Sequence, residues 1–319
     1  MNFINVIKRI SFLPIKLVES VIKKTNWYRN SIPNIDNYPG DSWYRNHLDR
    51  NYDVVNLGSS SSVFCFNYDG LDVRAFNWAL RPQSMEYSYK VLKQYFSILR
   101  PKGKVIIPFS PFSGLSVEGK WNESENDKYY YILDHTLIEN YNQVAWRRNH
   151  PLLSSPIQSL KRLIRDVPEV NIYSYNIQCK TQEEFKDSAH KWIQLWMKEF
   201  CIEDMEAQLN EEQLLGRYSR MKTIVEMIQF CLDRDIEPVI VIPPVHETLN
   251  LYFTPNFVQN YITTFIDELN MQNIKVLDYL NHPLFTKDAF FMDAFFMNEC
   301  GSKEFTKQVL KDLQLIATI

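Results

Sequence analysis

The chain has 319 residues, of which 45% are hydrophobic and 14% aromatic, so it is long enough to bury a large core within one domain. Its 35 basic and 38 acidic residues leave a formal net charge of -3, which offers no electrostatic footprint for a polyanion and argues against a nucleic-acid partner. The five cysteines show no metal-ligand spacing and are typical of reduced thiols in a cytoplasmic protein.

Residues 1–40 are expected to form an N-terminal helical extension. Basic side chains interrupt the apolar residues between positions 4 and 24 too often for a membrane span, and no uninterrupted apolar stretch marks a secretory signal. Leu13, Leu17 and Val21 recur every four residues and therefore share one face of the expected helix. Two interpretations stay open: residues 4–24 pack on the edge of the domain, or they rest as a basic amphipathic helix on an anionic membrane surface.

The rest of the chain, residues 41–319, alternates short β-branched runs with helical patterns. Strands are predicted at 54–57, 105–107, 239–242 and 275–280, with a weaker fifth strand at 73–76. Apolar residues spaced by three and four follow these runs, as in helices that pack one face on a core. The alternation predicts an α/β fold. We expect a three-layer α/β/α sandwich with a five-stranded parallel, flavodoxin-like sheet.

Residues 111–211 are too many for a plain connection in a compact domain, and they are predicted to form a largely helical insertion. Because this insertion leaves the C-terminal end of a strand, it should lie beside the crevice in which open parallel sheets bind ligands. It is either a lid over that crevice or an aromatic-rich accessory layer. Its basic side chains face either solvent or an anionic partner, and they are Arg147, Arg148, Lys161, Arg162 and Arg165.

The end of the first strand is the most informative stretch, because NYDVVNLGSSSS runs from a buried strand into Gly58 and four serines. A glycine permits the sharp turn that lifts a serine hydroxyl to the top of the sheet. The backbone N–H groups that follow then face the point where an oxyanion would form. The pattern predicts a site centred on these serines.

The triplet Gly58-Ser59-Ser60 resembles the first sequence block of the SGNH/GDSL hydrolases, in which the third residue is the nucleophile. The segment from Phe76 to Ser84 is similar to the block that helps to form the oxyanion hole, with Asn77 in place and Ala79 where glycine is usual. Ser110 stands, by location, where the family often has an asparagine donor. The resemblance implies a nucleophile at Ser60 and an oxyanion hole formed by Ser60, Asn77, Ala79 and Ser110.

The last block of that family reads Asp-x-x-His, followed by Asn and Gly. Here Asp293, Asn298 and Gly301 are in register, but Phe296 occupies the histidine position. A serine hydroxyl needs a neighbouring base to take its proton, and a phenyl ring cannot do so. Asp288 begins an identical DAFFM pentapeptide but lacks Asn and Gly at the matching distance, so Asp293 is the expected catalytic aspartate.

His246 follows the strand predicted at 239–242, which would bring it to the same rim as Ser60 and Asp293. It is either a replacement base, oriented by Asp293, or an ordinary loop residue. No glycine-rich phosphate loop or metal-ligand cluster is present in the sequence, so no cofactor and no metal are expected.

Family members with a similar Gly-Ser-Ser opening are tied to bacterial capsules and exopolysaccharides, so the resemblance implies a role in surface polysaccharide biosynthesis or modification. The departures at Phe296, at Ala79 and at the asparagine position favour a catalytically impaired protein that binds a polysaccharide, an acylated sugar or a partner protein. The alternative is an active serine esterase or O-acyltransferase that uses Ser60 with a non-standard base such as His246. A cytoplasmic protein is expected, with any membrane contact made through residues 4–24.

Overall fold

The computed structural model describes residues 14–30, 51–115, 121–167, 180–269 and 274–317, and these fall into two compact units. One unit lies within Met1–His47 and Asn122–Ser174, and the other, the sheet unit, within Leu48–Trp121 and Tyr175–Ile319. The boundaries differ from the predicted ones, because the middle of the expected insertion joins the N-terminal residues. One contact links the two segments of that unit: the Asp166 carboxylate accepts hydrogen bonds from the backbone N–H groups of Asn26 and Trp27 at 2.6 and 3.0 Å.

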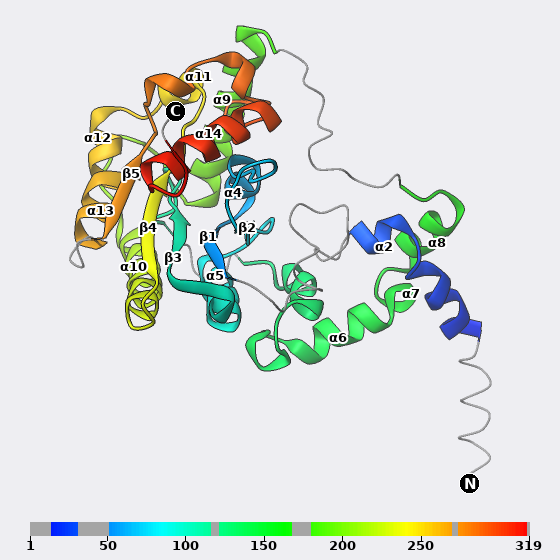
Figure 1. Ribbon diagram of the computed structural model, residues 1–319. Helices are drawn as coiled ribbons and strands as arrows, with labels where there is room; N and C mark the ends of the chain where they lie inside the picture. The colour runs from blue at the N-terminus through cyan, green and yellow to red at the C-terminus, as the bar shows by residue number, and fades with distance from the viewer. Residues whose placement is uncertain (1–13, 31–50, 116–120, 168–179, 270–273, 318–319) are drawn as a thin grey trace. The chain divides into compact units, whose positions relative to one another are not determined.

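Five strands form one parallel sheet in the order β2-β1-β3-β4-β5, which Figure 1 shows from right to left. This arrangement confirms the predicted fold class of a three-layer α/β/α architecture around a five-stranded parallel sheet. The strands are β1 (Tyr52–Asn56), β2 (Ala75–Asn77), β3 (Leu99–Pro108), β4 (Glu237–Ile242) and β5 (Lys275–Asp278).

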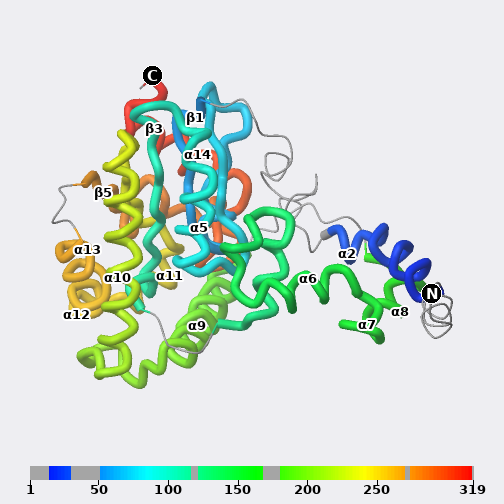
Figure 2. Tube along the Cα trace, turned by 90° about the horizontal axis from the view of Figure 1, so that it is seen from below, coloured from blue at the N-terminus to red at the C-terminus, as the bar shows by residue number. Residues whose placement is uncertain are grey.

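Side chains of the strands alternate between two faces of the sheet, and the buried stretches, such as 105–108 of β3 and 238–242 of β4, are apolar. On one face, Val54, Ile106 and Val239 share a core cluster with Phe305 and Val309 of the last helix. The opposite face is covered by helices that pack on one another, and Figure 2 shows one of them, α10 (Glu211–Leu232), running alongside the strands. The sheet is therefore sandwiched, and its C-terminal edge is where chain segments can converge.

The other helices of the sheet unit are short except for two. α9 (Gln182–Glu199) begins with a capping box in which Thr181 and Glu184 satisfy each other's backbone N–H groups, and α14 (Glu299–Asp312) is capped by Asn298. The remainder are α4 (Ser60–Cys65), α5 (Met85–Tyr95), α11 (Glu247–Asn250), α12 (Pro255–Phe257) and α13 (Thr264–Leu269), with the 3-10 turns η1 (Phe96–Ile98), η7 (Pro283–Phe285) and η8 (Asp288–Phe290) and the π-helix η5 (Val258–Thr263).

The unit that contains the N-terminal residues is built from short helices. It comprises helical residues 14–22, α2 (Asn26–Asn30), η2 (Glu123–Tyr131), η3 (His135–Leu137), α6 (Tyr141–Asn149), α7 (Pro151–Ser154) and α8 (Pro156–Ile164). Residues 1–13, which include Leu13 of the predicted amphipathic helix, lie outside the described residues. Among the helices that are described, none has both the length and the apolar character that a membrane span requires.

Candidate functional site

The turn after β1 is built around Gly58, whose φ of 121° lies in a region that side chains rarely adopt. A Cβ atom at this position would lie 2.1 Å from the Ser62 hydroxyl oxygen, so the space also requires glycine. Ser59 is the N-cap residue of α4, and its hydroxyl accepts a hydrogen bond from the Gln83 backbone N–H at 3.1 Å. The Gln83 side chain donates to the Gly58 carbonyl, also at 3.1 Å. Gln83 thus holds the serine turn in place.

A cavity of about 380 Å³ opens at this turn. Ser60 and Ser110 both line it, so two of the predicted site residues come together. The Ser110 hydroxyl lies 2.8 Å from that of Ser113, whereas the Ser60 hydroxyl has no hydrogen-bond partner among the described residues. The rest of the lining is mainly hydroxyl and aromatic, and it includes Ser84, Ser88, Phe112, Trp121, Trp192, Trp196, Phe200 and Phe295.

Asn77 and Ala79 do not line this cavity, and the hydrogen-bond donors expected from them are engaged elsewhere. The Asn77 amide donates to the carbonyl oxygens of Ser62 and Phe66 at 3.1 and 3.0 Å. Its side-chain oxygen accepts the Ala79 backbone N–H at 3.0 Å. Both residues are buried, and these hydrogen bonds fix the path of the chain at this point.

His246 also differs from its predicted position, because its ring is fully buried rather than on the rim beside Ser60. The ring stacks on Phe185 with centroids 3.8 Å apart. Its Nδ1 atom accepts the Thr248 backbone N–H at 3.2 Å, so Nε2 carries the proton and donates to an Asp288 oxygen at 3.1 Å. The carboxylate that orients His246 therefore belongs to Asp288 and not to Asp293. Neither ring nitrogen is directed at the serine cavity.

Asp293 lines a second cavity, of about 520 Å³, together with Lys180 and Lys191. Its carboxylate accepts the backbone N–H groups of Phe295 and Phe296 at 2.8 and 2.7 Å. Burial raises the pKa of the Asp293 carboxyl above its ordinary value, against these two hydrogen bonds, which lower it. Ser60 and Asp293 thus line different cavities.

Helix α9 forms the wall between the two cavities, since Trp192 and Leu195 line both. Phe296, at the histidine position of the resembled block, packs between Phe64 and Trp192 with ring centroids 4.8 and 5.1 Å away. Phe64 is the fourth residue after Ser60 and lies on the same side of α4. The last block therefore lies against the serine helix, with an aromatic contact where the family has an imidazole.

The ionisable groups that line the serine cavity are Glu199 and Arg220. Burial lowers the pKa of the Arg220 guanidinium, while the carboxylate of Glu86, 3.3 Å away, raises it. Sequence patterns gave no signal for these two residues, because both lie within long amphipathic helices in which charged residues are ordinary. Gln83 was within the resembled block, but only the structure reveals that it holds the turn.

Metal binding has no support in the described residues, which contain no group of three or more His, Cys, Asp or Glu side chains placed to hold an ion. Cys65, Cys201, Cys231 and Cys300 are free thiols, and Cys179 lies outside the described residues. Burial raises the pKa of the Cys65 thiol to about 12, so it is not a nucleophile near neutral pH.

Comparison with known proteins gives no family for this chain. No family model matches the sequence, and no curated protein is significantly similar to it.

Proposed function

We propose that this protein has an SGNH/GDSL-like site that binds a glycan or acylated sugar of a surface polysaccharide pathway without hydrolysing it. The observation that carries the proposal is the composition of the serine cavity, whose described lining contains many hydroxyl and aromatic groups but no imidazole. A serine hydroxyl without a base stays protonated near neutral pH and is a weak nucleophile. Binding can persist where the chemistry has been lost.

The lining offers the two kinds of contact that a sugar uses. Serine hydroxyls, including those of Ser60 and Ser110, can exchange hydrogen bonds with sugar hydroxyls, while the rings of Trp121 and Trp192 can pack on the apolar face of a pyranose. The volume of about 380 Å³ falls within the range of small-molecule sites, roughly 300–1,000 Å³. These features support an acylated monosaccharide or a short glycan end as the ligand.

A fluorophosphonate probe tests the absence of catalysis, because it labels only an activated serine. The wild-type protein should remain unlabelled. Phe296→His returns an imidazole to the segment that packs on α4 and should raise labelling at least about tenfold, since a positioned base contributes roughly 10²–10⁴-fold in rate. Peptide mapping by mass spectrometry identifies the labelled residue.

The double variant Phe296→His/Ser60→Ala is the control and should lose the signal. Labelling of the wild-type protein at Ser60 would contradict the proposal and support the alternative, an active serine esterase or O-acyltransferase.

One observation favours that alternative: Glu199 lines the serine cavity and is the one carboxylate of its described lining. In this mechanism, Ser60 attacks the acyl carbon and its proton passes to Glu199; Glu199 then gives that proton to the departing alkoxide, so the C–O bond of the ester breaks, the alcohol leaves and the acyl-enzyme forms. Glu199→Gln would then abolish wild-type labelling. His246→Ala separates the two bases, because it would abolish labelling only if the buried imidazole reaches Ser60.

Sugar binding is tested with O-acetylated and de-O-acetylated capsular oligosaccharides in isothermal titration calorimetry. Trp192→Ala should weaken the affinity of a bound oligosaccharide about two- to tenfold, because one aromatic contact contributes roughly 0.5–1.5 kcal/mol. Trp146 is half-exposed and belongs to the other unit, so Trp146→Ala is a matched control that should leave the affinity unchanged. An oligosaccharide that binds Trp192→Ala and wild type equally would place the ligand outside this cavity.

A further inference from the structure

Large apolar side chains are exposed along two helical segments of the unit that contains the N-terminal residues. On α8, Ile157 and Ile164 are 84% and 89% exposed, and Leu160 lies between them on the same face. In helical residues 14–22, Leu17 and Val21 are one turn apart and are also exposed. We call these five side chains the apolar face.

The opposite sides of the same segments are packed, so the exposure is not a sign of poor folding. Ser159 of α8 is fully buried, and its hydroxyl donates to the Pro151 carbonyl at 2.8 Å. Ile22 is fully buried, and the buried Glu19 carboxylate lies 3.4 Å from His150. Each of these helices therefore packs one side against its own unit, while the side chains of the apolar face are exposed to solvent.

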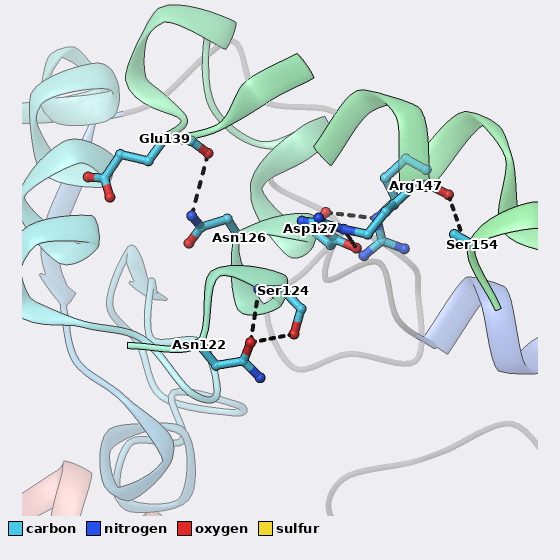
Figure 3. Close-up of polar contacts among 8 residues, drawn as sticks. Asn122, Ser124, Asn126, Asp127, Glu139, Arg147 and Ser154 are labelled. Carbon is cyan, nitrogen blue, oxygen red and sulfur yellow. Dashed lines mark hydrogen bonds and ion pairs between the residues drawn. The ribbon is translucent and has the colours of Figure 1, made fainter. Parts of the chain in front are cut away.

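Polar contacts join η2, α6 and the end of α7, the helix that precedes α8, as Figure 3 shows. The Arg147 guanidinium of α6 makes hydrogen bonds to both carboxylate oxygens of Asp127 in η2, the shortest at 2.6 Å. The Ser154 hydroxyl at the end of α7 donates to the Arg147 carbonyl at 3.4 Å. A bidentate arginine pair imposes a fixed geometry, so α6 is held against η2. Helix α8 follows directly after these helices in the chain.

The charge around the apolar face is strongly positive, although the whole chain carries a net charge of -3. Described residues 14–30 and 150–167 contain seven basic side chains and two acidic ones. The two acids are already engaged, since Glu19 faces His150 and Asp166 accepts two backbone N–H groups. The basic residues are Lys16, Lys23, Lys24, Arg29, Lys161, Arg162 and Arg165.

We propose that the apolar face docks on the surface of a membrane that contains anionic lipids, with the helices lying in the interfacial plane. The apolar side chains would enter the region between head groups and acyl chains, while the basic side chains pair with lipid phosphates. A second copy of the chain would carry the same positive charge at this face, so it fits the charge pattern less well. The proposal concerns a different unit from the serine cavity and does not depend on the proposed function.

Co-sedimentation of the full chain with vesicles tests this proposal. The protein should sediment with vesicles of phosphatidylcholine and phosphatidylglycerol at low salt, and binding to pure phosphatidylcholine vesicles should be at least about tenfold weaker. Ile157→Ser/Ile164→Ser should reduce binding to the anionic vesicles by about tenfold or more, because two exposed apolar side chains are lost. Lys161→Gln/Arg162→Gln/Arg165→Gln should also reduce it by about tenfold or more and should weaken its salt sensitivity, because three of the seven basic side chains are lost.

Leu215→Ser/Leu251→Ser is the matched control, because these side chains are 71% and 80% exposed but belong to the sheet unit. This variant should bind vesicles as the wild type does. Failure of the wild type to sediment with anionic vesicles would overturn the proposal, as would equal binding by Ile157→Ser/Ile164→Ser. A wild-type dimer in analytical ultracentrifugation that these two substitutions convert to a monomer would also overturn it and assign the apolar face to a second copy.

Discussion

Asp293, Asn298 and Gly301 each hold a structural position near the start of α14. The Asp293 carboxylate fixes the turn that follows it, and the Asn298 side chain accepts the Gly301 backbone N–H at 2.9 Å. A Cβ at Gly301 would lie 2.1 Å from the Phe290 carbonyl oxygen, so glycine is needed there for space. The three residues therefore have structural roles that do not depend on whether the protein is an enzyme. The fold does not need a histidine at position 296, because the ring of Phe296 packs on Phe64 and Trp192 there.

Asp293→Asn should remove a pH dependence of stability that the buried carboxyl causes. Since the folded-state pKa is raised, the folded protein holds this proton more tightly than the unfolded chain does. The stabilisation is complete below the unfolded pKa of about 4 and is lost as pH rises through the folded pKa. The stability of Asp293→Asn relative to wild type should thus increase as the pH rises above about 4. Urea unfolding at several pH values measures this difference, and a difference that falls with pH would contradict the assignment.

Some residues of the site could be placed from the sequence, and others could not. Ser60 and Ser110 follow neighbouring parallel strands, and the C-terminal ends of such strands meet at one edge of a sheet. The partner of His246 is 42 positions away, at Asp288, and no periodicity predicts such a pairing. Likewise, the Asn77 amide donates hydrogen bonds to the carbonyl oxygens of Ser62 and Phe66. A buried polar group needs a hydrogen-bond partner, and the sequence does not show which one the fold supplies. The catalytic or binding roles of the site residues remain predictions.

At the scale of elements, the junction between β1 and α4 depends on one backbone conformation. Gly58→Ala should lower the free energy of unfolding by about 2–4 kcal/mol, because it adds both backbone strain and a collision with Ser62. Gly70→Ala separates the two effects: Gly70 also has a positive φ, but a Cβ there would have no neighbour within 4 Å. It should cost only about 1–2 kcal/mol. Chemical denaturation compares the variants, and equal losses would mean that the Ser62 contact is unimportant.

The elements of the sheet were the most predictable part of the fold. Four β-branched runs and one weaker run in the sequence correspond to the five strands, because the parts of a parallel sheet that are covered on both faces favour apolar, β-branched residues. The long connection after β3 was less predictable. Its helical character followed from its length and its aromatic spacing, but the role of α9 as a wall between two cavities depends on which neighbours Trp192 meets.

At the scale of the whole molecule, the candidate site and the basic surface belong to different units. The serine cavity and the Asp293 cavity lie in the sheet unit, whereas the concentrated positive charge and the apolar face lie in the unit with the N-terminal residues. The sequence indicated a basic amphipathic segment at residues 4–24 but not its association with α8, because residues 14–22 and 156–164 are far apart along the chain. Vesicle binding and serine labelling should therefore respond to separate substitutions, and a change in one assay should leave the other unaltered.

The indole of Trp192 forms part of two hollows at once. A rotation of this indole would change the shape of both cavities, so a ligand in one cavity can influence binding in the other. Thermodynamic reciprocity then requires the two effects to be equal: a ligand beside Asp293 changes the affinity for a ligand beside Ser60 by the same factor as the second ligand changes the affinity for the first.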